Sequence, residues 1–345
     1  MKNIYGLTIN QLEEEMLSLG QKKYRATQLF IWLYEKKAKS FDEMSDVSIG
    51  FRQILKKTYT MDLPNVSVKQ ESQDGTIKLL LEMSDGAKVE CVLMRYEYGN
   101  ALCVSSQVGC NMGCAFCASG LMHKQRNLET YEMVTQVLAM NQQLAEDDHV
   151  THVVIMGTGE PFDNYDNVMS FIRIINHPHA LAIGARHISV STCGLVDKIR
   201  QFATEGLQVN LAVSLHAPSN ELRDSIMKIN HAFPLKDLMD AVKDYETQTS
   251  RRVTFEYILL SGVNDNLQQA KELANLVRGM NAYINLIPYN EVNEMPFKRS
   301  NYDRVRFFCD YLKQNGVNVT VRKEFGTDID AACGQLRAKK EGIIK

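Results

Sequence analysis

Apolar residues recur every three or four positions along the first sixty residues. Segments 10–20, 24–37 and 48–59 all show this spacing, which is typical of helices that bury one face. Gly20 and Gly50 fall near the ends of these runs, where glycine often punctuates helices. The pattern predicts a small helical module over residues 1–62.

The apolar spacing changes to two in the next thirty residues. Segments 66–72, 76–83 and 87–94 alternate in the manner of strands. They are separated by QDG and SDG, which are both typical of tight hairpin turns. We therefore expect a short antiparallel β segment over residues 63–95.

Predicted strands and helices alternate from residue 96 onward. Amphipathic helices such as 131–145, 235–246 and 302–316 lie between most of the strands. The predicted strands are 101–107, 152–159, 187–194, 209–217, 253–260, 283–290 and 317–325. Repeated strand–helix units favour a parallel sheet with right-handed crossovers. The predicted fold class is α/β, with a partial barrel of about six units over residues 96–345. A doubly wound open sheet is the alternative.

Composition places the chain among ordinary globular proteins, with 345 residues, 45% hydrophobic and 23% charged. No apolar run approaches the ~18 residues of a membrane span, and the first residues lack the apolar core of a secretory signal. We expect a cytoplasmic protein with no membrane segment. In that reducing compartment, the eight cysteines favour metal binding or redox chemistry over structural disulfides.

The formal net charge of −2 does not indicate nucleic-acid binding, but the helical module is locally basic. Residues 20–60 carry nine Lys or Arg against four acids, a balance of +5. A solvated helix surface explains this balance, and so does a surface for the RNA backbone. Two further stretches, 123–127 and 337–345, add basic residues that we expect to be exposed.

Three cysteines lie within the short stretch CNMGCAFC. Cys110, Cys114 and Cys117 follow the spacing Cys-x3-Cys-x2-Cys. A structural zinc site is closed by four ligands, whereas three thiolates on a [4Fe–4S] cluster leave one iron open to a small molecule. The spacing favours the cluster. A zinc site completed by a distant residue such as His123 is the alternative.

Further candidates follow other predicted strands. In MGTGEP, residues 156–161, glycines allow the backbone to approach a ligand, and Glu160 is able to accept a hydrogen bond from an amine. Cys103 lies on the strand that leads into the cysteine cluster. Cys333 lies between small residues, so a substrate can reach its thiol. A buried core cysteine is the alternative for both.

The cysteine spacing resembles that of the radical S-adenosylmethionine (SAM) superfamily. Together with CVSSQVGC, VSLHAP, SGVND and DIDAACGQL, it makes nearly the whole chain similar to the RlmN group of radical SAM methyltransferases. This resemblance implies methylation of carbon 2 of an adenine in 23S rRNA and in tRNA. It implies a [4Fe–4S] cluster and SAM as cofactors, and a reductant such as flavodoxin or ferredoxin as a partner. We expect a monomer.

The resemblance also implies roles for individual residues. Cys110, Cys114 and Cys117 would hold the cluster. Because carbon 2 of adenine is electron-poor, Cys333 would first take a methyl group from one SAM, and a radical made from a second SAM would activate it. Cys103 would then release the product by forming a disulfide with Cys333.

Other positions match the SAM site and a proton acceptor. Glu90 matches a carboxylate that acts as proton acceptor, although a strand Glu that points outward is the simpler alternative. The SAM-binding positions are Gly159, Glu160, Ser191, Ser214, Leu215, His216 and Asn290. Phe325 stands where many members have a basic residue.

Two other functions are alternatives. A relative that methylates carbon 8 of the same adenine shares the cysteines, but Pro161 favours carbon 2. A non-catalytic iron–sulfur or zinc protein that binds RNA would need neither Cys333 nor the SAM motifs.

Overall fold

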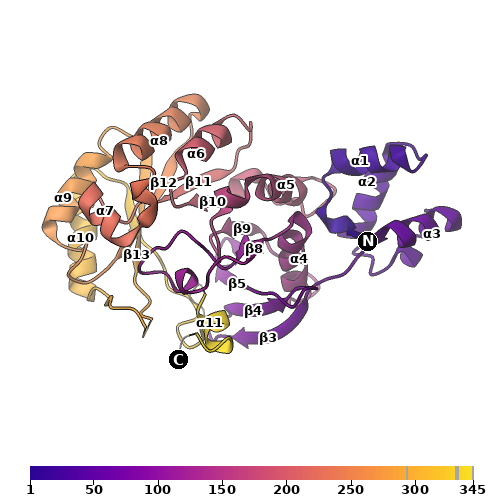
Figure 1. The fold of residues 1–345 in the computed structure, drawn as a ribbon, viewed down its shortest axis with the longest axis horizontal. Coiled ribbons are helices and arrows are strands. Elements are labelled where there is room, and N and C mark those ends of the chain that lie inside the picture. Colours follow the sequence, from indigo (N-terminus) through magenta and orange to yellow (C-terminus); the bar gives the residue numbers. More distant parts are fainter. Residues whose placement is uncertain (293, 331–333, 344–345) are drawn as a thin grey trace.

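The computed structural model describes residues 1–292, 294–330 and 334–343. Its amino-terminal part is helical, as predicted, and lies at one end of the molecule (Figure 1). Its helices are α1 (Ile9–Ser18), α2 (Tyr24–Phe30) with a π-helical continuation η2 (Ile31–Glu35), and α3 (Ile49–Thr58). A capping box starts α1, in which Thr8 and Gln11 each accept the other's backbone N–H in a side-chain oxygen. Strands β1 (Lys2–Asn3) and β2 (Tyr59–Thr60) pair in parallel and join the two ends of this module.

One ten-stranded sheet organises the rest of the chain, in the order β14-β13-β12-β11-β10-β9-β6-β5-β4-β3. All seven predicted strands of the barrel are confirmed, and they run parallel. They are β6 (Gly99–Cys103), β9 (His152–Ile155), β10 (Ile188–Thr192), β11 (Asn210–Ser214), β12 (Val253–Leu259), β13 (Ala282–Pro288) and β14 (Val319–Val321). Their order never reverses, so the sheet is a singly wound, open barrel and the doubly wound alternative is wrong.

The three predicted antiparallel strands are present but do not form a sheet of their own. They are β3 (Asn65–Glu71), β4 (Ile77–Glu82) and β5 (Lys88–Tyr96). Because β5 also pairs with β6, the antiparallel strands extend the barrel sheet by three strands. The predicted domain boundaries after residues 62 and 95 stay a prediction.

Helices cover the outer face of the parallel strands (Figure 1). They are α4 (Thr130–Asn141), α5 (Tyr165–Asn176), α6 (Val196–Ala203), α7 (Asn220–Ile226), α8 (Leu235–Thr249), α9 (Leu267–Leu276) and α10 (Tyr302–Gln314). On α5, Val168, Phe171, Ile172 and Ile175 repeat at helical spacing, and all four are fully buried. Each such side chain contributes about 1.5–3 kcal/mol by leaving water. None of the described helices is long and apolar enough to cross a membrane.

The carboxyl-terminal segment crosses the sheet from one edge to the other. It leaves β14 and reaches the β3–β4 hairpin, where the N–H of Gly326 donates to Asp74 Oδ2 at 2.8 Å and Ser72 donates to Asp328. Helix α11 (Gln335–Lys340) follows, beside these strands (Figure 1). The segment thus joins the two edge regions of the open barrel.

Candidate active site

A cavity of about 500 Å³ lies where the parallel strands end. Its wall includes Cys103 on β6, Gly157 after β9, Ile258 on β12, Pro288 on β13 and Arg322 after β14. The carboxyl ends of barrel strands are the usual place for an active site, because loops from several strands meet there.

This cavity brings together four residues predicted from the sequence: Glu90, Cys103, Cys117 and Asn290. Cys333 lies outside the described residues. The other predicted residues lie around the cavity rather than in the described part of its lining: Cys110, Cys114, Gly159, Glu160, Ser191, Ser214, Leu215 and His216.

Strand register explains how distant residues reach one face of the sheet. Paired residues on neighbouring strands point to the same side, and so do alternate residues along one strand. Following the pairs from β5 to β11 places Glu90, Cys103, Ser191 and Ser214 on the inner face. The outer-face residues pack against the helices. Glu90 therefore points inward and is only 4% exposed, so the alternative of an outward strand Glu is wrong.

The cysteine loop lies between β7 (Gln107–Val108) and the short helix η4 (Ala118–Leu121). Gly109 has a φ of +80°, and a Cβ atom there would lie 2.2 Å from the carbonyl oxygen of His123. Only glycine fits this turn, which folds the loop back so that Cys110 N–H donates to the carbonyl of Met122 at 2.9 Å.

The three thiols fit a multi-iron cluster. Burial and the charge of Cys117 raise the pKa of Cys110 to about 11, and burial with both neighbouring thiols raises that of Cys114 further. Such an array needs a bound cation to become three thiolates. In residues 1–292, 294–330 and 334–343, no three His, Cys, Asp or Glu side chains are arranged to hold a single metal ion. A [4Fe–4S] cluster does not need such a grouping, because it spreads its ligands over several irons.

The Gly-x-Gly-Glu turn packs tightly against the strand beside it. A Cβ atom at Gly159, whose φ is +111°, would lie 2.6 Å from Cβ of Gln107, so this glycine is required by the neighbouring chain. Glu160 is buried, and its two oxygens accept the N–H groups of Phe162 at 3.0 Å and Cys193 at 2.7 Å. Burial raises the pKa of Glu160. Hydrogen bonds from the backbone and side chain of Cys193, from the Thr192 side chain and from the backbone of Phe162 act in the opposite direction and favour the carboxylate.

His216 is held as a neutral ring. Its Nδ1 accepts the N–H of Ile258 at 3.0 Å, and burial together with the Arg223 charge lowers its pKa to about 3. The ring meets Phe116 of the cysteine loop edge to face, with centroids 4.8 Å apart. His216 thus links the end of β11 to the cluster loop, and it contributes shape and hydrogen bonding rather than charge.

Arg223 on α7 is a residue that the sequence analysis missed. Its fully buried guanidinium donates to the carbonyls of Cys193 at 2.7 Å and Leu215 at 3.3 Å. These contacts fix the ends of β10 and β11, which carry the predicted SAM-binding residues. An isolated Arg in a short helix gives no signal of this role.

Glu90 joins the antiparallel strands to the carboxyl-terminal segment. Its carboxylate pairs with Lys78 at 2.9 Å, accepts the N–H of Gly334 at 2.9 Å and accepts the N–H of Arg337. Lys78 was not predicted as a site residue. The signal available was a lysine inside the apolar strand TIKLLLEM.

Gly334 brings the carboxyl-terminal segment against the cluster loop. Its φ is +77°, and a Cβ atom there would lie 2.8 Å from Ser119 Oγ. Ser119 lies two residues after Cys117, and Gly334 directly follows Cys333 in sequence. The two cysteine-bearing segments therefore meet at the cavity, through residues that the structure describes.

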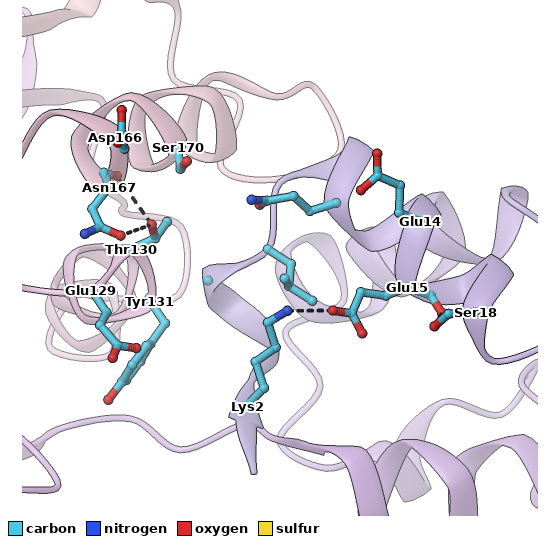
Figure 2. A pocket seen from close by; sticks show the side chains of 13 residues that line it. Lys2, Glu14, Glu15, Ser18, Glu129, Thr130, Tyr131, Asp166, Asn167 and Ser170 are labelled. Carbon is cyan, nitrogen blue, oxygen red and sulfur yellow. Dashed lines mark hydrogen bonds and ion pairs between the residues drawn. The ribbon is translucent and has the colours of Figure 1, made fainter.

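A second cavity, of about 820 Å³, lies between the helical module and helices α4 and α5 (Figure 2). It is lined by four carboxylates, those of Glu14, Glu15, Glu129 and Asp166, whereas its lysine, Lys2, is paired with Glu15 at 2.5 Å. An acidic wall repels phosphates, so this cavity does not suit the RNA backbone.

The basic stretches differ in whether their side chains are exposed, paired with acids or buried. Lys22 and Tyr24 are exposed at the start of α2, and the guanidinium of Arg25 lies 5.1 Å from the Tyr24 ring centre. The expectation that residues 123–127 and 337–345 expose free basic groups is wrong for three of them. Lys124 pairs with Asp163, Arg126 pairs with Glu132, and Arg337 is buried.

Comparisons with known proteins agree with this site. A model of the Radical SAM superfamily matches residues 104–276, and one of the Ribosomal RNA large subunit methyltransferase N-terminal domain matches residues 2–61. A protein of Streptococcus equi subsp. zooepidemicus (strain H70), named "Probable dual-specificity RNA methyltransferase RlmN", is 56% identical over 342 residues, covering 97% of this chain and 95% of its own.

Two further matches extend over nearly the whole chain. A protein of the same name from Spiroplasma citri is 53% identical, with 100% of each chain covered. A solved structure, of a radical SAM methyltransferase from Sphaerobacter thermophilus, is 42% identical with a TM-score of 0.92 and covers 97% of this chain and 99% of its own. The chain therefore belongs to the RlmN family of radical SAM RNA methyltransferases.

Proposed function

We propose that this enzyme methylates carbon 2 of an adenine in 23S rRNA and in tRNA, through Cys333 and Cys103. The observation that carries the proposal is the inner-face cavity that joins Cys103, Glu90 and Cys117. Gly334 packs beside it, directly after Cys333 in sequence. Membership of an enzyme family sets aside the alternative of a non-catalytic RNA-binding protein.

Two groups of residues in this chain are suited to hold the cofactors. In this proposal Cys110, Cys114 and Cys117 hold a [4Fe–4S] cluster. SAM is held by Glu160, through its amine, and by Gly159, Ser191, Ser214, Leu215, His216 and Asn290. When bound, the cluster and SAM supply a radical that removes hydrogen from a methyl group. The buried Phe116 ring of the cysteine loop and the neutral His216 ring keep water away from that chemistry.

In this proposal the thiols of Cys333 and Cys103 carry out the remaining steps. Cys333 would accept a methyl group from one SAM, and after hydrogen removal its carbon would bond to carbon 2 of the adenine, with the unpaired electron of the adduct leaving to the cluster as the electron acceptor. A base removes the proton from carbon 2, and in this proposal the base is Glu90 or Cys103, which line the same cavity. The Cys103 thiolate then attacks the Cys333 sulfur; a disulfide forms, the bond from that sulfur to the transferred carbon breaks, and this carbon takes up a proton to become the methyl group of the released RNA. An external reductant restores the two thiols.

The partners follow from the same proposal. The exposed basic residues at the start of α2 contact the RNA backbone, and the target adenine leaves its stack to enter the cavity. A flavodoxin or ferredoxin supplies electrons in the cytoplasm, and the enzyme acts as a monomer.

Nucleoside analysis tests this proposal. The reconstituted enzyme is incubated with SAM, a reductant and either protein-free 23S rRNA or tRNA, and digested RNA is examined by mass spectrometry against synthetic standards. We expect 2-methyladenosine from both RNAs. The 8-methyl isomer would instead assign the enzyme to the alternative chemistry, and unmodified adenosine with an intact cluster would contradict the proposal.

A further inference from the structure

Several polar contacts fasten the carboxyl-terminal segment to the antiparallel strands. Besides the Gly326 and Asp328 contacts, the Gln70 side chain accepts the N–H of Asp330 at 3.2 Å and donates to the Asp330 carboxylate at 3.2 Å. Within the segment itself, Lys339 pairs with Asp330 at 2.5 Å. Strands β3, β4 and β5 thus provide a docking surface for residues 326–330 and 334–337, in addition to extending the sheet.

A buried ion pair lies at the centre of this surface. Lys78 and Glu90 have side chains that are 0% and 4% exposed, and their charged atoms are 2.9 Å apart. The removal of two charges from water is costly, and a well-packed apolar pair would often be as stable. Register places both side chains on the inner face, beside Cys103. Folding stability alone therefore does not explain why an ion pair occupies this position.

The pair bonds the backbone on both sides of residues 331–333. Lys78 Nζ donates to the carbonyl of Asp330. Glu90 accepts the N–H of Gly334 at 2.9 Å and that of Arg337, which satisfies two of the unpaired N–H groups at the start of α11. One member fixes the chain before the segment and the other fixes it after.

We propose that Lys78 is a positioning residue and that, together with Glu90, it fixes the two ends of the segment carrying Cys333; for Glu90 this is in addition to its proposed role as a proton acceptor. This inference rests on the proposed function, in which Cys333 carries the methyl group. It assigns Lys78 a positioning role in the reaction. It also explains why strands β3, β4 and β5 extend the barrel sheet, since they hold the carboxyl-terminal segment. The pair sets where the carboxyl-terminal thiol is presented, while the cluster and SAM sites are built independently by β6–β14 and their loops.

Three variants test the proposal: Lys78→Met, the double variant Lys78→Met/Glu90→Gln, and the control Lys88→Met. Lys88 lies on β5, is partly exposed and pairs only distantly with Glu82, at 3.9 Å. Four quantities are measured: melting temperature, iron and SAM binding, deuterium uptake by peptides from residues 326–343, and methylation of RNA.

We expect Lys78→Met to bind iron and SAM like the wild type but to take up deuterium faster in residues 326–343. RNA methylation should fall roughly tenfold or more, since a displacement of about 1 Å can cost up to ~100-fold. The double variant removes the unpaired buried charge, so it should recover melting temperature, whereas deuterium uptake in residues 326–343 should stay faster than in the wild type. A purely structural pair would recover both.

The inference would be overturned if Lys78→Met methylates RNA as fast as Lys88→Met. It would also be overturned if the double variant recovers both its melting temperature and the deuterium uptake of the wild type. Failure of the proposed function looks different, because the wild-type enzyme itself would then leave the RNA unmodified.

Discussion

At the scale of single residues, burial sets the charge state of groups in and around the cavity. His216 stays neutral because its pKa lies near 3, and burial raises the pKa of the Cys103 thiol. At neutral pH Cys103 is therefore mainly a thiol and must lose its proton before it attacks a sulfur. The guanidinium of Arg322, which also lines the cavity, acts in the opposite direction and favours the thiolate.

Gly334 offers a test at this scale. Gly334→Ala combines a positive φ, which costs an ordinary residue roughly 1–2 kcal/mol, with a clash against Ser119. We expect the variant to keep its iron and SAM but to lose most of its RNA methylation, because the segment after Cys333 is displaced.

Gly342→Ala is the matched control for this variant. Gly342 has a φ of +68°, but a Cβ atom there meets nothing within 4 Å. Equal RNA methylation rates for the two variants would mean that the contact with Ser119 is unimportant.

At the scale of elements, the sequence allowed prediction of the strands but not of their partners. The alternation in residues 66–94 predicts three strands, yet the pairing of β5 with β6 depends on the turn at residues 97–98, which has no strong hairpin signal. The role of β3 and β4 as a docking surface was not predictable, because its contacts join residues about 250 positions apart. Local periodicity does not report contacts of that separation.

The helical module offers a test at the scale of elements. Lys22, Lys23 and Arg25 are changed together to Gln, and RNA affinity is measured across a range of salt concentrations. Each lost phosphate contact should reduce the slope of log affinity against log salt by about 1, so a decrease of up to about 3 is expected. SAM binding should not change.

A triple variant of the same charge change provides the control: Arg200, Lys236 and Lys243 to Gln, on α6 and α8 at the other end of the molecule (Figure 1). These residues are exposed as well. If both triple variants lower the slope equally, the effect is one of net charge and the module has no special role.

At the scale of the whole molecule, the chain brings together segments from its beginning, middle and end. The cysteine loop follows β6 in the middle of the sequence, whereas Gly334 and α11 come from its end. The periodicity and the cysteine spacing predicted the barrel and the cluster loop, because both are local patterns. The carboxyl-terminal crossing was not predicted, since residues 322–330 form no regular element. The resemblance alone connected Cys333 to this site.

The central claim is that Cys333 carries the methyl carbon and Cys103 releases the product. Its most direct test is the Cys103→Ala variant, expressed in cells, digested with nuclease and protease, and examined by mass spectrometry. The account predicts a nucleotide bound to the peptide that contains Cys333, because the thiol that resolves the adduct is missing. It also predicts that Cys333→Ala forms no adduct and no methylated RNA. An intact cluster without any adduct in Cys103→Ala, or methylated RNA from Cys333→Ala, would contradict the account.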